Sequence, residues 1–258
     1  MKISHPLAVL LLLLSPMPAR ADEQTVLKDD FSGYSTDTDF NTGNPSNTDD
    51  WSFFPLPNSE ALALVSAGTE SKAYARIRQT NPADGRADWC FFRLFNEPVG
   101  IGGNEILEFE ASIRCVDSGQ SSDLIFGLIG GNFKRIPDNN NFLTFFRFLG
   151  IVENNLHQFR YWKSGASPDE GEYVTPASFS IIQNEWYTFR SVFNLKENTL
   201  SFQLRNEQGD TVLDVADIPF RRGFESIVGI AFKNRTNDAN RSARFDLTDV
   251  VIRRIPLQ

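Results

Sequence analysis

Residues 105–115 read Glu-Ile-Leu-Glu-Phe-Glu-Ala-Ser-Ile-Arg-Cys, and this stretch decides the fold class. Apolar side chains occupy every second position from Leu107 to Cys115, and glutamate, serine and arginine stand between them. Successive side chains of a β-strand point to opposite faces, so the alternation predicts a half-buried strand. One face of this strand packs on a core and the other faces solvent.

The same period recurs along the chain. Segment 199–206 repeats it, and segment 186–194 places Tyr187, Phe189 and Phe193 on one side. Turn-forming Gly, Asn and Asp residues separate the segments, and no amphipathic pattern spans a helix of a dozen residues. We therefore predict an all-β fold, a two-sheet antiparallel jelly-roll sandwich. Further strands are expected near 61–66, 72–78, 88–95, 123–129, 142–149, 156–163, 211–215, 226–233 and 243–254.

The N-terminus has the pattern of a targeting segment. Lys2 precedes an apolar run over 7–14, and Ala19-Arg20-Ala21 forms a small-x-small cleavage site. The run is shorter than the roughly 20 residues of a membrane span. We expect residues 1–21 to be a signal peptide and residues 22–258 to be one jelly-roll domain, secreted or periplasmic, with no membrane span.

The net charge of the chain narrows the class of partner. The chain carries a formal net charge of −8, which disfavours nucleic acid and anionic membranes as partners.

Cys90 and Cys115 are the two cysteines of the chain. An even pair in an exported protein predicts a disulfide, and because both cysteines lie in strand-like segments, the bond would join neighbouring strands.

Three passages resemble the concanavalin A-like lectin/glucanase superfamily, especially the laminin G-like modules of exported proteins. They are Leu27-Lys28-Asp29-Asp30-Phe31-Ser32-Gly33 followed by Trp51; Asn184-Glu185-Trp186-Tyr187-Thr188-Phe189 followed by residues 198–202; and the closing segment 245–252. The resemblance covers nearly the whole predicted mature chain. It implies a jelly roll whose ligands bind on the concave face or at the rim loops.

The resemblance also implies a structural metal. Related modules commonly carry Ca²⁺ where the two ends of the domain meet, and Ca²⁺ prefers six to eight oxygen ligands. Asp30 near the start and Asp246 and Asp249 near the end are the candidate ligands. The alternative is that these carboxylates are solvated turn and strand-end acids.

A glycan would be recognised by aromatic stacking and polar donors. Tryptophan and tyrosine stack on sugar faces, while arginine donates to hydroxyls and carboxylates. In a chain with 23 Phe, most aromatic residues belong to the core, so few are free for this role. The candidate ligand-binding residues are Trp89, Arg93, Arg147, Arg160, Tyr161 and Trp162.

One alternative is an enzyme of the same fold. Residues 161–165, Tyr-Trp-Lys-Ser-Gly, resemble the Tyr-Phe-Lys-Ala-Gly motif of jelly-roll alginate lyases. In a lyase, Arg160 would neutralise a uronate while His157 and Tyr161 serve as base and acid. The Arg-x-Glu-Leu-Arg and Gln-Ile-His strands of those enzymes are missing. The competing interpretation is an ordinary strand with alternating core and surface residues.

A second catalytic alternative uses paired carboxylates. Glu108 and Glu110 share a strand face, and a retaining glycosidase needs two such groups. Superfamily glucanases place acids at three successive same-face positions, whereas Ile106 stands at the first position here. We predict a glycan-binding, lectin-like domain that acts on a concave sheet face without turnover. The alternatives are a polysaccharide lyase or hydrolase, and a structural or adhesion module.

Overall fold

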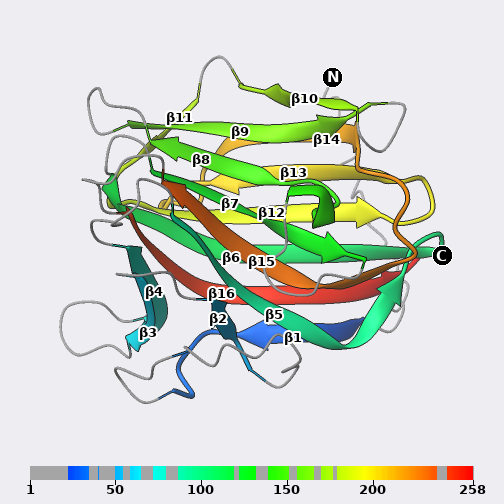
Figure 1. The fold of residues 1–258 in the computed structure, drawn as a ribbon. Helices are drawn as coiled ribbons and strands as arrows, with labels where there is room; N and C mark the ends of the chain where they lie inside the picture. The colour runs from blue at the N-terminus through cyan, green and yellow to red at the C-terminus, as the bar shows by residue number, and fades with distance from the viewer. Residues whose placement is uncertain are drawn as a thin grey trace, which may run out of the picture.

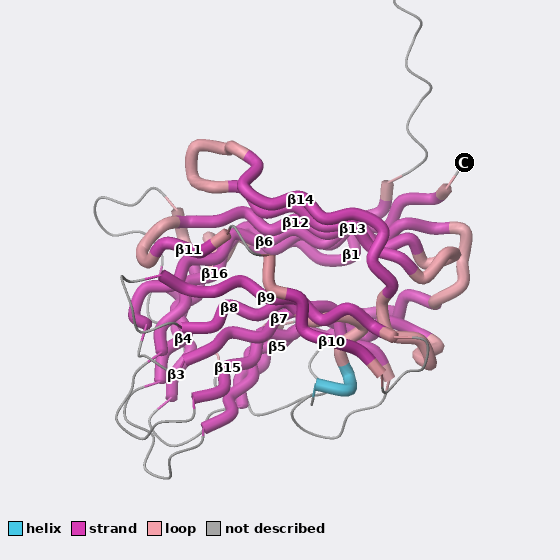
Figure 2. Tube along the Cα trace, turned by 90° about the horizontal axis from the view of Figure 1, so that it is seen from above, coloured by secondary structure: helices cyan, strands magenta, loops and turns pink. Residues whose placement is uncertain are grey.

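Two antiparallel β-sheets lie face to face in the computed structural model (Figures 1 and 2). The structure describes residues 23–34, 40, 50–54, 59–64, 72–79, 87–118, 122–131, 139–150, 156–165, 170–176, 179–236 and 243–257. The predicted signal peptide lies outside these residues. Within them, no helix is long and apolar enough to cross a membrane.

The first sheet, sheet A, contains the first and last strands of the described chain. Its hydrogen-bonded order is β14 (Thr211–Pro219), β13 (Thr199–Arg205), β12 (Trp186–Asn194), β6 (Glu105–Ser118), β16 (Ala243–Pro256), β4 (Tyr74–Gln79) and β3 (Ser59–Leu64). β1 (Gln24–Asp29) pairs with β16 next to this path. Strands from distant parts of the sequence are thus neighbours, as in a jelly roll.

The second sheet, sheet B, consists of the remaining strands. Its order is β10 (Gly171–Val174), β9 (Leu156–Ser164), β8 (Phe146–Gly150), β7 (Ser122–Gly130), β15 (Ser226–Thr236), β5 (Ala87–Gly100) and β2 (Ser52–Phe54). β11 (Ser180–Ile182) also pairs with β9, and a 3₁₀ turn spans Asn139–Asn141. The predicted all-β, two-sheet architecture is confirmed, and every predicted strand is present.

Phenylalanine rings fill the space between the sheets. Burial alternates residue by residue along β12 and β13, as the period-2 pattern predicts. The ring centres of Phe126 and Phe146, from sheet B, lie 5.1 and 4.3 Å from the ring centre of Phe189 in sheet A. Phe202 joins them 5.0 Å from Phe146. This core leaves the alternate side chains of each sheet on its outer face.

The two cysteines do not form the predicted disulfide. Both are free, buried thiols. Cys115 belongs to the inter-sheet core, whereas Cys90 belongs to a smaller apolar cluster with Phe92 and Ile125 on the outer side of sheet B. The prediction assumed neighbouring strands, but β5 and β6 lie in different sheets, which typically pack about 10 Å apart. Burial raises the pKa of both thiols.

Candidate functional site

Strand register assembles a row of charged residues on the outer face of sheet A. Arg76 on β4 lies opposite Asp246 on β16, and Asp246 lies opposite Arg114 on β6. Arg114 in turn lies opposite Trp186 on β12. Directly opposite residues in antiparallel strands bring their side chains into contact. Four strands therefore contribute one continuous row across the sheet.

Asp246 holds this row together. Its carboxylate is fully buried and accepts hydrogen bonds from Arg76 at 2.7 and 2.9 Å and from Arg114 at 2.6 and 3.0 Å. The Arg114 guanidinium lies 4.6 Å from the centre of the Trp186 ring, a cation–π distance. Arg114 is thereby fixed in position by a charge on one side and an aromatic ring on the other.

The next row along the sheet supplies hydroxyl groups. Ser112 on β6 lies opposite Thr188 on β12, and their hydroxyl oxygens are 3.3 Å apart. Thr188 lies opposite Arg205 at the end of β13. Beyond Arg205 the chain turns through residues 206–210, and Asn206 stabilises the turn by accepting a hydrogen bond from the Asp210 amide at 2.8 Å. This turn forms one wall of a hollow.

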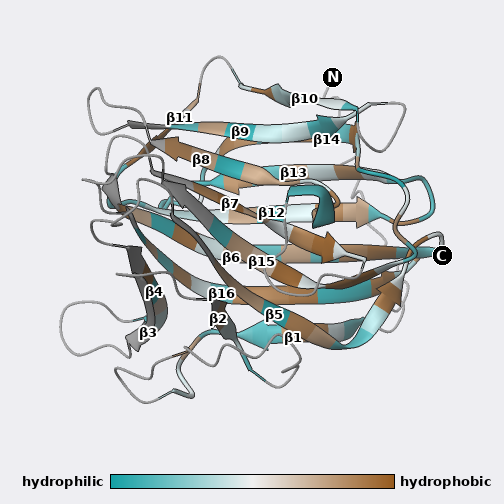
Figure 3. Ribbon diagram, viewed as in Figure 1, coloured by the Kyte–Doolittle hydropathy of each residue, from teal (hydrophilic) through white to brown (hydrophobic). Residues whose placement is uncertain are grey.

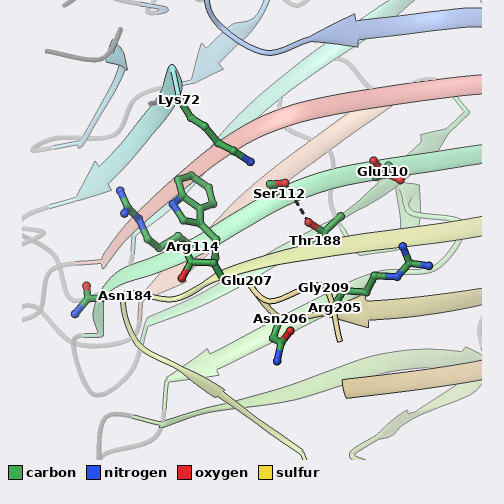
Figure 4. A pocket seen from close by; sticks show the side chains of 11 residues that line it. Lys72, Glu110, Ser112, Arg114, Asn184, Thr188, Arg205, Asn206, Glu207 and Gly209 are labelled. Atoms are coloured by element: carbon green, nitrogen blue, oxygen red, sulfur yellow. Dashed lines mark hydrogen bonds between the residues drawn. The ribbon is translucent and has the colours of Figure 1, made fainter. Parts of the chain in front are cut away.

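These rows enclose a groove of about 590 Å³, shown from close by in Figure 4. That volume lies within the range of pockets that hold small molecules. The groove combines three basic residues, two carboxylates, hydroxyls, amides and one aromatic ring. Its lining residues are Lys72, Glu110, Ser112, Arg114, Asn184, Trp186, Thr188, Arg205, Asn206, Glu207 and Gly209.

The paired carboxylates of the hydrolase alternative have different environments. Glu110 lines the groove, but Glu108 is buried beside it and accepts hydrogen bonds from Arg190 and from Arg253, the latter at 2.6 Å. Burial alone would raise the pKa of Glu108, yet the two guanidinium groups hold it below its usual value. Glu108 is therefore an ionised structural group and cannot serve as a general acid.

Three of the predicted ligand-binding residues share the outer face of sheet B. Arg147 on β8 lies directly opposite Arg160 on β9. Trp162 is on the same face, but its ring stacks on Phe145 at 5.5 Å and the backbone of Gly171 packs against it. Trp162 is therefore a supporting ring, with little open face for a sugar.

The other predicted residues lie elsewhere. Tyr161 points into the inter-sheet core, 5.1 Å from Phe202, so it faces away from Arg160, and burial raises its pKa. Arg93 forms an ion pair with Asp29 of β1 at 2.9 Å. The side chains of Trp89 and His157 lie outside the described part. The lyase trio of Arg160, Tyr161 and His157 is thus not assembled around one face by the residues that the structure describes.

The predicted calcium ligands do not fit a shared metal site. Asp246 is enclosed by two arginines, and Asp249 pairs with Lys72 at 3.1 Å. Asp30 accepts hydrogen bonds from the amide and hydroxyl of Ser32. Among the described residues, no group of three or more His, Cys, Asp or Glu is placed to hold a metal ion.

Apart from Glu110, sequence reasoning did not identify the groove residues as site residues. The assignment of Tyr187 and Phe189 to the core already implied that Trp186 and Thr188 face outward. A tryptophan in an outward-facing strand position is a usable signal, because most large aromatic side chains are buried. The partners that Trp186 meets depend on strand register, which local periodicity leaves open.

Comparison with solved structures identifies the architecture. An alginate lyase, Aly36B, matches 93% of this chain and 100% of its own length with a TM-score of 0.57 and 16% identity. Lectin UEA-II in complex with galactose matches over 92% and 100%, with a TM-score of 0.50 and 8% identity. The chain has the concanavalin A-like jelly-roll fold.

A sialidase also matches 92% of this chain at 12% identity, with a TM-score of 0.55, but this chain spans only 19% of the sialidase. No protein-family model and no curated protein matches the sequence. Identities this low establish the concanavalin A-like fold and nothing more specific. The groove itself must therefore carry any argument about ligands.

Proposed function

We propose that this concanavalin A-like domain binds a short, uncharged glycan in the groove of sheet A without turning it over. The observation that carries the proposal is the convergence of Arg114, Thr188 and Arg205 with the Trp186 ring in one hollow. Sugars present both hydroxyls and C–H faces, so their sites combine hydrogen-bonding groups with an aromatic surface. The groove offers both kinds of group.

The charge balance of the groove favours a neutral sugar. Three basic and two acidic residues line it, and Asp246, which Arg114 shares with Arg76, offsets part of the charge of Arg114. Because Asp246 holds Arg114 in place, little side-chain entropy is lost when a ligand binds. The structural relatives that include a galactose-bound lectin and an alginate lyase support carbohydrate as the ligand class.

The state of the candidate catalytic groups supports binding without turnover. A retaining glycosidase needs one protonated carboxyl group and one ionised carboxylate that is open to the substrate. Both carboxylate oxygens of Glu108 accept hydrogen bonds from Arg190 and Arg253, and Tyr161 faces the core. The predicted signal peptide would deliver the domain outside the cytoplasm, and mass spectrometry of exported protein should then find an N-terminus near Asp22.

A glycan array followed by calorimetry tests the proposal. The expected result is a neutral mono- or oligosaccharide whose affinity falls at least tenfold in Trp186→Ala and in Arg205→Gln. Arg205 is exposed, so its variant should fold normally even if Trp186→Ala does not. Tyr173→Ala, an exposed aromatic change on sheet B, is the matched control. Binding that Arg205→Gln leaves unchanged, or release of reducing sugar on incubation, would contradict the proposal.

A further inference from the structure

The outer face of β6 carries a carboxylate that the fold leaves without a partner. Hydrophilic and hydrophobic residues alternate along the strands (Figure 3), and the outer face of β6 presents Glu108, Glu110, Ser112 and Arg114. Glu108 is held by two arginines, and Arg114 by Asp246. Among the described residues, no hydrogen bond or ion pair involves the carboxylate of Glu110.

The arginine nearest in register does not neutralise Glu110. Arg190 on β12 lies directly opposite Glu110, and Val251 on β16 lies opposite it on the other side. The Arg190 guanidinium is turned toward Glu108, to which its Nε and Nη2 donate hydrogen bonds. Glu110 is partly exposed and lines the groove, so its oxygens are open to a ligand.

An open carboxylate restricts what the groove can hold. It accepts hydrogen bonds and donates none, and its two oxygens can serve two donors at once. A ligand that displaces water from Glu110 must supply O–H or N–H donors, because a desolvated carboxylate without them costs free energy. In an uncharged sugar these donors are hydroxyl groups, and two adjacent hydroxyls of one ring match the two oxygens.

The two ends of the groove offer a sugar different partners. Arg114 and Glu110 are four residues apart on β6, which separates their Cα atoms by about 14 Å. Trp186 lies opposite Arg114, so the aromatic ring is at the end away from Glu110. The Arg205 guanidinium extends toward the Glu110 end (Figure 4) and donates a hydrogen bond to Gln203 at 3.1 Å. A single sugar ring is too short to contact both ends.

We propose that Glu110 selects the ligand of this groove, which is a neutral disaccharide or longer chain with two adjacent free hydroxyls on the unit beside Glu110. This inference rests on the glycan-binding function proposed above and adds the residue that sets its specificity. One unit of the ligand lies against Trp186, and the next donates two hydrogen bonds to Glu110 and accepts one from Arg205. The carboxylate also repels anionic sugars, which agrees with a neutral ligand.

Calorimetry with analogues that lack single hydroxyls tests the role of Glu110. Maltose, cellobiose, lactose and mannobiose serve as probes, together with any neutral glycan that the array identifies. With the wild type, monodeoxy analogues of the probe that binds best should bind about tenfold or more weakly at two adjacent positions, because each hydroxyl donates to a charged acceptor. Glu110→Ala should weaken the parent sugar at least as much, and the same two analogues should then bind as the parent does.

Glu197→Ala is the matched control. Glu197 is an exposed glutamate on the turn after β12 and does not line the groove, so its variant should bind the probe as the wild type does. Glu110→Gln keeps the size of the side chain and removes its charge. It should weaken binding as well, so that a folding defect in Glu110→Ala does not decide the result.

The outcomes separate this inference from the function on which it rests. If a probe binds and is weakened by Arg205→Gln but not by either Glu110 variant, the groove binds glycan and the role of Glu110 is refuted. If Glu110→Ala weakens the parent and its deoxy analogues by the same factor, Glu110 does not contact these hydroxyls, and the inference is refuted as well. If neither the disaccharides nor the array yields a ligand for the wild type, the proposed function and this inference fail together.

Discussion

Replacing Asp246 with asparagine should destabilise the domain by about 3 kcal/mol. The carboxylate is fully buried and accepts four hydrogen bonds from Arg76 and Arg114, whose side chains are 23% and 10% exposed. Removing one partner of a buried ion pair typically costs about 3–5 kcal/mol, because the remaining charge stays buried and unpaired. We take the lower end because Arg76 reaches solvent and can rehydrate.

Urea denaturation and thermal melting would measure this loss. In a domain of this size, each kcal/mol lowers the melting temperature by about 2–4 °C, so a decrease of about 6–12 °C is expected. Asp249→Asn is the matched control, because Asp249 and its partner Lys72 are 41% and 55% exposed. Exposed pairs contribute about 0–1 kcal/mol, and asparagine tolerates the positive φ of 50° at this position.

A loss below about 1 kcal/mol in Asp246→Asn would refute the argument that this carboxylate anchors the row. A second readout follows from the position of Arg114 between Asp246 and Trp186. If Asp246 fixes Arg114 for ligand binding, the variant should also lose affinity for any sugar bound in the groove. Retained affinity in a destabilised variant would separate the two roles.

Three further predictions concern other parts of the fold. The pKa of Glu108 is lowered in the folded state, so its stabilising contribution is present above about pH 4.3 and is lost as the pH falls through the folded pKa. Urea titrations between about pH 3 and 6 should therefore show that the free energy of unfolding depends less on pH in Glu108→Gln than in the wild type. In Gly171→Ala the new methyl would come within 2.5–2.6 Å of the Trp162 ring, so calorimetric melting should show a loss of about 1–3 kcal/mol. Cys90 and Cys115 should react with a thiol reagent only after unfolding, giving two thiols without reductant, whereas a count of zero would indicate the disulfide.

Local periodicity was sufficient to predict the fold, because the alternation of apolar and polar residues within each segment shows which side chains of that strand are buried. The alternation from Leu107 to Cys115 predicted the buried face of β6 without reference to any other segment. The disulfide prediction rested instead on the cysteine count, and periodicity could not test it. Around Cys90 the chain reads Trp-Cys-Phe-Phe, apolar at every position, because both faces of sheet B are covered by hydrophobic clusters there. A continuous apolar run does not reveal which way each side chain points.

The candidate sites depend on information that no local pattern contains. Arg76 and Asp246 are 170 positions apart, and Arg114 and Asp246 are 132 apart, yet register places the three side by side. Sequence could identify Arg147 and Arg160 as candidate ligand-binding residues, because both were expected in strands. It could not show that they lie directly opposite each other.

Strand register also fixes how charged residues are arranged on the two outer faces. On sheet A the arginines Arg76 and Arg114 flank the carboxylate of Asp246, so one negative charge offsets part of two positive charges. On sheet B, Arg147 lies directly opposite Arg160. Neither strand can slip along its neighbour, because a shift of one residue would expose the phenylalanine core. Both arrangements therefore persist for as long as the core remains packed.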